Sequence, residues 1–561
     1  MGRKPGNEEV ILESVTDGDG RQVYRSSFTV SGQGGTKALL ASRLAVIPVI
    51  FLPGLMGTNL RSRESGEAVW RPPNASFRPT DILGIIGALL TWGFRGPKER
   101  QEALDAAKLE VDDRGSIALG KSGLSRETAR ARGWGSVSRT SYNPVMALLQ
   151  ERLNAMMRRG EPGAWWEAEG MRDPAAYGEE LGGNAPLTRD ELSSAARYRF
   201  DVWCCGYNWL QSNRDSARDL LAYIDGVVLE HYRGEEELEP QAGRMKVILV
   251  THSMGGLVAR ALKLVEGGED RILGVIHGVQ PATGAPAIYH HMRCGYEGLE
   301  RFVLGRNAGQ VTAVAARSAG CLELVPTFDH RDGAPWLFAC REGEWDPADT
   351  EGLPLRLPQQ GDPYREIYQS QEWYGLVPKQ NEKFLDLSGK TRGPASSART
   401  DYDLKIDSVA RFHDEVAGQY VAATYVHYGA FAGLDMHSWR DVVWQGDLDW
   451  IASSGSATHD NGRGTYGACG RAEGVSLTRV AGAGDGTVCV WSGSAPAKTG
   501  KRQGVEASFQ HGDRGSGCPD GQCKEYGHQG SFNDKGGRTQ WASLYSIVKI
   551  AQRADWSPEE V

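Results

Sequence analysis

The sequence predicts an α/β fold, with a mostly parallel sheet that carries helices on both faces. From residue 46 to residue 286, short apolar runs alternate with amphipathic helical patterns, as expected where crossover helices join parallel strands. At 561 residues the chain exceeds what one hydrophobic core usually supports, so we expect a large insertion or a second domain. The net charge of −8 gives no reason to expect nucleic acid as a partner.

The chain before the first core strand, residues 1–45, is predicted to form an N-terminal hairpin extension around the turn Asp17–Gly20. The apolar run Val49–Leu52 is predicted as the first buried strand. It leads into Pro53–Thr58, a loop whose glycines let the backbone approach a ligand closely.

The longest apolar run, Ile82–Phe94, is too short to span a bilayer. It is either a core helix or a mobile or membrane-touching lid, and in the second case the lid would comprise residues 70–140. The N-terminus shows no apolar stretch of the Sec signal type, so we expect a cytoplasmic protein or export by a non-Sec route.

The next elements continue the alternation. A helix is predicted to start at Asn143 with Pro144 as its first residue, and residues 160–196, rich in Gly, Pro and acidic side chains, are predicted to be loop. Phe200–Gly206 is a strand candidate, and Ser212 caps the helix after it.

The stretch Val247–Arg260 organises the rest of the chain. A buried strand, the turn Thr251–Gly256 and an amphipathic helix follow one another, which is the context of a nucleophile elbow with Ser253 at its tip. A strand at Ile272–Val279 follows this helix. The alternative to a nucleophile elbow is that Ser253 only caps a core helix.

Beyond Pro281 the alternation stops. We predict that residues 46–286 form the first part of the core, that 287–420 form a cap insertion, and that 421–561 form the second part of the core. In this last part, strands are predicted at Tyr425–Tyr428 and Ser476–Val480, and a closing helix at Gln540–Ala551.

The second part of the core also supplies the partners of the serine. Asp485 lies in a Gly-rich loop just after a strand, and His528 follows it, giving the order Ser–Asp–His of the α/β-hydrolases. The histidine would take the serine proton and the aspartate would orient the imidazole. The rivals are Asp447, Asp449 and His511, and His252 is expected to be structural.

Two backbone N–H groups are expected to stabilise the oxyanion, one at Leu55 and one at Met254. No cofactor is predicted. The pair His290–His291 lacks carboxylates at ligand spacing, so no metal site is predicted. Cys518 and Cys523 are spaced to close a small disulfide loop.

Five motifs resemble those of the lecithin:cholesterol acyltransferase-like lipases. The resemblance implies that the protein is a bacterial member of that family. The five motifs are Pro48–Leu60, Gly206–Trp209, Thr251–Gly256, Gly484–Val488 and Gly527–Phe532. The resemblance implies the triad Ser253, Asp485 and His528, oxyanion donors at Leu55 and Met254, and substrate contacts at Gly54 and Trp209. Two positions depart from the family pattern: Asn208 replaces an acidic residue, and Thr251 replaces a small one.

These observations predict a serine carboxylic-ester hydrolase of lipids, a lipase or phospholipase, working through an acyl-serine intermediate. The expected partners are a lipid or phospholipid substrate and a membrane surface. An acyltransferase with the same triad is one alternative. The resemblance extends to antibacterial phospholipase effectors of type VI secretion, for which an immunity protein would cover the cap. A non-catalytic binding protein on the same fold is the least favoured alternative.

Overall fold

A computed structural model describes residues 14–16, 22–24, 45–72, 92–235, 238–297, 301, 305–389, 397–421, 423–433, 438–454, 458–468, 474–500, 503–512 and 523–556. The predicted turn Asp17–Gly20 and most of the apolar run Ile82–Phe94 lie outside these ranges. Of that run, Trp92 is buried and Phe94 is 85% exposed.

A six-stranded parallel sheet forms the centre of the fold, as predicted. Its strands are β3 (Ala45–Leu52), β9 (Tyr198–Cys204), β10 (Val247–His252), β11 (Ile272–Gly278), β14 (Thr424–Ala430) and β19 (Val505–Gly512). Their order is β19-β14-β11-β10-β3-β9, and every neighbouring pair is parallel. Every residue of β3, β10 and β11 is buried, as expected for strands covered on both faces.

Helices cover both faces of this sheet. Helices α4 (Arg139–Leu153) and α18 (Arg538–Ala551) pack against each other and against the sheet. Helix α9 (Gly255–Ala261) packs against β10 and β11 and also against α6 (Asn213–Tyr223), whose N-cap is Ser212 as predicted. The predicted α/β-hydrolase fold class is therefore confirmed.

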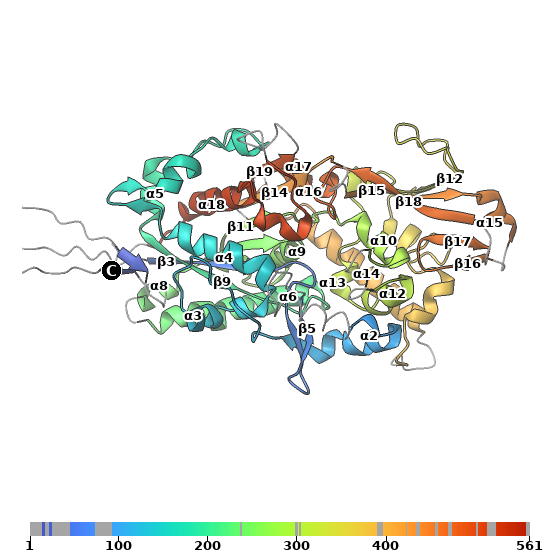
Figure 1. Cartoon of the computed structure of the whole chain (residues 1–561), viewed down its shortest axis with the longest axis horizontal. Helices are drawn as coiled ribbons and strands as arrows, with labels where there is room; N and C mark the ends of the chain where they lie inside the picture. The colour runs from blue at the N-terminus through green and yellow to red at the C-terminus, as the bar shows by residue number, and fades with distance from the viewer. Residues whose placement is uncertain are drawn as a thin grey trace, which may run out of the picture.

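A second sheet of six strands lies at the far end of the molecule from β3, on the right in Figure 1. It contains β12 (Leu337–Cys340), β13 (Leu355–Leu357), β15 (Ser438–Gly446), β16 (Thr458–Asp460), β17 (Thr465–Ala468) and β18 (Gly474–Gly482). Between the two sheets lie α10 (Pro286–Cys294), α12 (Ala308–Ala315), α13 (Ala319–Leu322) and α14 (Ala398–Val416) (Figure 1). The predicted strand at Ser476–Val480 thus belongs to this sheet, within β18. The division at residue 420 stays a prediction.

Shorter elements complete the description. They are β1 (Ser14–Thr16), β2 (Gln22–Tyr24), β4 (Leu60–Ser62), β5 (Ala68–Trp70), β6 (Leu109–Val111), β7 (Met157–Arg158), β8 (Glu161–Pro162), α2 (Pro97–Ala103), α3 (Arg126–Ala131), α5 (Arg189–Ala195), α7 (Glu230–Arg233), α8 (Glu239–Ala242), α15 (Leu448–Ser454), α16 (Val490–Gly493) and α17 (Ala495–Thr499). Strands β1 and β2 pair antiparallel, as the N-terminal hairpin requires. Within the ranges given above, no helix is both long and apolar enough to span a membrane.

Several elements differ from the sequence prediction, the following three among them. Helix α4 begins at Arg139 rather than Asn143, so Pro144 lies inside it and leaves the carbonyl of Thr140 without its helical donor. Helix α5 forms where loop was expected, because Thr188 and Glu191 build a capping box at its start. Strand β19 was not predicted at all.

Cys523 is disulfide-bonded, whereas Cys518 lies outside the described residues, so their pairing stays a prediction.

Candidate active site

Ser253 stands at the turn between β10 and α9, with its backbone in the left-handed region at a φ of +53°. This conformation is costly for a residue with a Cβ and is typical of functional turns. The turn is held by a hydrogen bond from the Ser253 N–H to the carbonyl of Gly278, at 2.9 Å. A Cβ on Gly255 would lie 2.7 Å from the carbonyl oxygen of Pro53, so only glycine lets the helix start this close to β3.

The three predicted catalytic side chains meet at this turn. Nε2 of His528 lies 2.8 Å from Oγ of Ser253, and Nδ1 of His528 lies 2.8 Å from Oδ2 of Asp485. Asp485 is almost fully buried, while the imidazole of His528 remains 12% exposed and Ser253 7% exposed. The site is therefore shielded from bulk water but open to a substrate.

The loop that carries Asp485 holds the carboxylate from several sides. Its Oδ1 accepts the N–H groups of Thr487 at 3.0 Å and Val488 at 2.8 Å, which leaves Oδ2 for the histidine. Ser438 fixes the loop in turn, accepting the N–H of Gly486 and donating to the carbonyl of Val488. The carboxylate is thus oriented before any substrate arrives.

His528 begins a 3₁₀ helix, His528–Asn533, that docks onto α4. Its own N–H donates to the backbone carbonyl of Asp485 at 2.8 Å. At the other end, Asn533 donates to the carbonyls of Thr140 and Ser141. The carbonyl freed by Pro144 is therefore used to anchor the segment that carries the histidine.

The loop Pro53–Thr58, which carries the predicted oxyanion donor Leu55 and is called the oxyanion loop below, approaches the serine closely. A Cβ on Gly54 would lie 2.9 Å from Cβ of Ser253 and 2.6 Å from Nδ1 of His252. Within the part of the chain that the structure describes, the N–H groups of Leu55 and Met254 make no hydrogen bond. Two donors beside the serine are thus available to a ligand.

We expect Gly54→Ala to lower kcat by about a hundredfold, since the added methyl must displace the loop or the serine. Gly226→Ala is the matched control, because a Cβ there meets nothing within 4 Å. Steady-state ester hydrolysis by the two variants measures the difference. Equal activity of Gly54→Ala and Gly226→Ala would show that the close approach is not needed.

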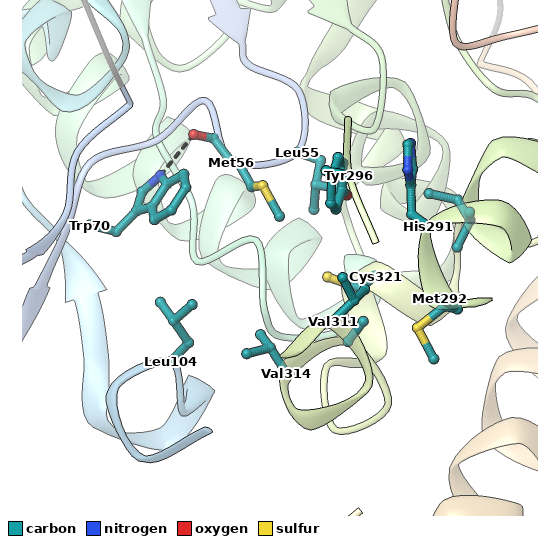
Figure 2. Close-up of a pocket in the computed structure, with 12 residues that line it drawn as sticks. Leu55, Met56, Trp70, Leu104, His291, Met292, Tyr296, Val311, Val314 and Cys321 are labelled. Carbon is teal, nitrogen blue, oxygen red and sulfur yellow. Dashed lines mark hydrogen bonds between the residues drawn. The ribbon is translucent and has the colours of Figure 1, made fainter. Parts of the chain in front are cut away.

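A small apolar pocket opens beside Leu55 and Met56 of this loop (Figure 2). Leu55 and Met56 form one wall, and the indole N–H of Trp70 fixes this wall by donating to the carbonyl of Met56 at 2.9 Å. The remaining lining residues are Leu104, Ile288, His291, Met292, Tyr296, Val311, Val314, Ala315 and Cys321. Burial lowers the pKa of His291 to about 4 and raises that of Cys321 to about 11, so the lining carries no charge at neutral pH.

The rival residues lie away from the serine. His511 is buried on β19, with its Nδ1 2.9 Å from the hydroxyl of Tyr526. Asp447 caps the start of α15, and Asp449 pairs with Arg341 in an exposed ion pair.

The other singled-out residues have structural contacts. Asn208 donates to the carbonyls of Ala106 and Leu109. Oγ1 of Thr251 lies 3.1 Å from Nδ1 of His277. Trp209 is fully buried behind Trp70, with their ring centroids 5.4 Å apart, so it does not line the pocket. His290 stacks on Trp439 and His291 stacks on Tyr296.

Sequence reasoning missed one residue of the pocket and one residue beside the oxyanion loop. Trp70 lines the pocket, and the hydroxyl of Tyr142 lies 3.1 Å from Nδ1 of His252. Neither belongs to a motif, and Tyr142 is 110 residues from its partner, so no local pattern identifies it.

Comparison with known proteins gives one informative result. No family model and no curated protein matches the chain. Among solved structures, the chain is similar to a protein in the crystal structure of the Tle4–Tli4 complex, with 50% sequence identity and a TM-score of 0.85. The similarity covers 92% of this chain and 100% of that one, so it includes both the central sheet and the cap.

Proposed function

Because the chain belongs to the family of Tle4, a type VI secretion phospholipase effector, we propose that Ser253, His528 and Asp485 form its catalytic triad. The protein is a serine ester hydrolase of the lipase or phospholipase class. This assignment rests on two contacts of His528, each 2.8 Å long. Its Nδ1 lies next to Oδ2 of Asp485, and its Nε2 lies next to Oγ of Ser253.

The geometry supports a two-stage reaction. Oγ of Ser253 attacks the ester carbonyl while Nε2 of His528 takes its proton, and the carboxylate of Asp485 stabilises the imidazolium through Nδ1. The oxyanion accepts the N–H groups of Leu55 and Met254, each worth about 3 kcal/mol in the transition state. The imidazolium then protonates the leaving alcohol, and water repeats the sequence on the acyl-serine.

We propose that the apolar pocket holds the acyl chain of the substrate. It begins at Leu55, and the neighbouring Gly54 lies so close to the proposed nucleophile that a Cβ on it would be 2.9 Å from Cβ of Ser253. Its uncharged lining suits a hydrocarbon, which gains about 0.8 kcal/mol for each methylene removed from water. Gly54 would contact the ester, whereas Trp209 would act only by supporting Trp70.

Filling this pocket is expected to shift chain-length preference. In Val314→Trp the larger side chain takes space from the acyl chain, and each excluded methylene should lower kcat/KM about fourfold. Hydrolysis of a series of p-nitrophenyl esters from four to sixteen carbons measures the shift, and the short ester serves as the internal control. A uniform loss across the series would place the acyl chain elsewhere.

Covalent labelling tests the proposed function directly. A fluorophosphonate probe reacts only with an activated serine, so peptide mapping should find the adduct on Ser253 and on no other residue. Mass spectrometry of products from mixed phospholipids then identifies the bond that is cleaved. Labelling elsewhere, or none with a folded protein, would overturn the assignment.

The family also supports a biological setting. We propose that the chain is exported by a type VI route, acts on the phospholipid of a recipient cell, and is neutralised by an immunity protein, as the Tle4–Tli4 pairing suggests. The likeness to lecithin:cholesterol acyltransferase-like lipases is a finer proposal, supported by the placement of its five motifs around the triad and the oxyanion loop. In the motif Gly206–Trp209, the hydroxyl of Tyr207 donates to the carbonyl of Pro53 at 2.8 Å. Acyl transfer uses the same residues, and product analysis with an added alcohol separates it from hydrolysis.

A further inference from the structure

His252 precedes the nucleophile, and its imidazole is fully enclosed. Nε2 of His252 lies 2.9 Å from the backbone carbonyl oxygen of His528. A carbonyl oxygen only accepts, so Nε2 must carry a proton. Burial, together with the nearby imidazole of His528, lowers the pKa of His252 to about 3, so the ring is neutral and its Nδ1 is a bare acceptor.

The phenol of Tyr142 completes this arrangement. Its hydroxyl oxygen lies 3.1 Å from Nδ1 of His252, and because that nitrogen is an acceptor, the phenol must be the donor. Burial raises the pKa of Tyr142 to about 12, which keeps the proton on the phenol. The same oxygen accepts the N–H of Gly54 at 3.2 Å.

The donor and the acceptor of each hydrogen bond in this series are therefore fixed, because the series begins at an N–H group, which only donates, and ends at a carbonyl oxygen, which only accepts. The order runs from the Gly54 N–H to the Tyr142 oxygen, from the Tyr142 hydroxyl to Nδ1 of His252, and from Nε2–H of His252 to the carbonyl of His528. One end is the residue before the proposed oxyanion donor Leu55. The other end is the backbone of the proposed general base.

We propose that Tyr142 and His252 are positioning residues, which set the oxyanion loop and the histidine loop at a fixed separation on either side of Ser253. Neither residue exchanges a proton with substrate. The three hydrogen bonds join residues of one polypeptide, so neither a second copy nor a ligand is needed to hold the two loops. This inference rests on the proposed function, since it assigns a task only if Leu55 and His528 serve the reaction.

The packing around the path supports a geometric task. The ring of His252 is also in contact with Phe532, which itself packs on Phe51 of β3, so the imidazole cannot turn freely. Gly54 has no Cβ, and one would collide with Nδ1 of His252. The loop, the phenol and the imidazole thus fit only in this arrangement.

The test compares variants that remove single atoms or single bonds. Tyr142→Phe removes only the hydroxyl, and we expect kcat to fall about tenfold to a hundredfold with KM unchanged, because the two loops are no longer held in register. His252→Leu should lower kcat further, since it removes the hydrogen bonds both to Tyr142 and to the carbonyl of His528. His252→Gln should recover part of that loss, because its amide N–H can still reach the carbonyl of His528.

Tyr232→Phe is the matched control. The Tyr232 hydroxyl is equally buried, accepts from the indole N–H of Trp203 and donates to Asp201, but it contacts no residue of the triad. We expect it to lower the melting temperature at least as much as Tyr142→Phe and to keep wild-type kcat.

The proposal is overturned if Tyr142→Phe keeps kcat within twofold of the wild type, or if Tyr232→Phe loses as much kcat. It is also overturned if His252→Gln is no better than His252→Leu. Fluorophosphonate labelling of Ser253 in the wild type is read separately. Failure of that labelling rejects the proposed function, whereas labelled Ser253 with indifferent Tyr142 rejects only the positioning role.

Discussion

Ser253→Ala is expected to lower ester turnover by on the order of a millionfold, because it removes the nucleophile from a unit whose members act together. The residual rate should come from the oxyanion donors and substrate binding alone. Stability should be close to that of the wild type, since alanine pays the same backbone cost at the positive φ of residue 253. Phospholipid hydrolysis, followed by mass spectrometry of the products, gives the measurement.

Ser193→Ala controls for the loss of a serine hydroxyl, since Ser193 is exposed on α5. That variant should retain full activity. If Ser253→Ala hydrolyses phospholipid at a comparable rate, the acyl-serine mechanism is refuted whatever the geometry of the site.

Acid is expected to unfold the protein at unusually mild pH because many buried histidines are neutral in the fold. Burial lowers the pKa of one set to about 3, namely His252, His277, His330 and His427. It lowers the pKa of His291 and His413 to about 4 and that of His511 well below its usual value. Each is protonated more readily in the unfolded chain, where the pKa is about 6.5.

The sign of the effect follows from proton binding. Between pH 6.5 and pH 4 the unfolded state binds more protons at these histidines, so the free energy of unfolding falls as the pH falls. Each histidine contributes up to about 1.4 kcal/mol per pH unit over that window. Glu323 and Glu180 act in the opposite direction, because burial raises the pKa of Glu323 to about 8 and that of Glu180 above its usual value, but they are two groups against seven.

Urea unfolding followed by tryptophan fluorescence from pH 4 to pH 8 measures this dependence. We expect the free energy of unfolding to be highest above pH 6.5 and to drop steeply below pH 6. His427→Leu should reduce the dependence of the unfolding free energy on pH, because it removes one of the buried neutral histidines. The substitution breaks no hydrogen bond, since neither ring nitrogen of His427 has a partner among the described residues. His459→Leu, at an exposed position, is the surface control. A flat profile in the wild type would contradict the buried neutral state.

The residues of the proposed triad could be predicted from the sequence because they stand in local patterns. A buried strand, a tight turn and an amphipathic helix frame Ser253, and a Gly-rich loop frames Asp485. The order of the elements followed from the same alternation. These signals span a few residues each, so they do not depend on contacts between distant parts of the chain.

What the sequence did not predict depends on such distant contacts. Strand β19, with the sequence VEASFQHG, is too polar to stand out and is ordered by its parallel pairing with β14. Helix α4 tolerates Pro144 because Asn533, almost four hundred residues later, takes up the freed carbonyl of Thr140. The second sheet pairs β12 with β15, about a hundred residues apart, and neither strand indicates its partner.

The order of strands in the parallel sheet has a consequence for biosynthesis. The proposed nucleophile follows β10 in the middle of the sheet, but β14, β19 and the segments that carry Asp485 and His528 all come later in the chain and leave the ribosome after it. In a nascent chain that has folded only its first half, Ser253 therefore still lacks the imidazole of His528 and the carboxylate of Asp485. On the proposed triad, ester hydrolysis therefore cannot begin before His528 has been synthesised and has folded against Ser253.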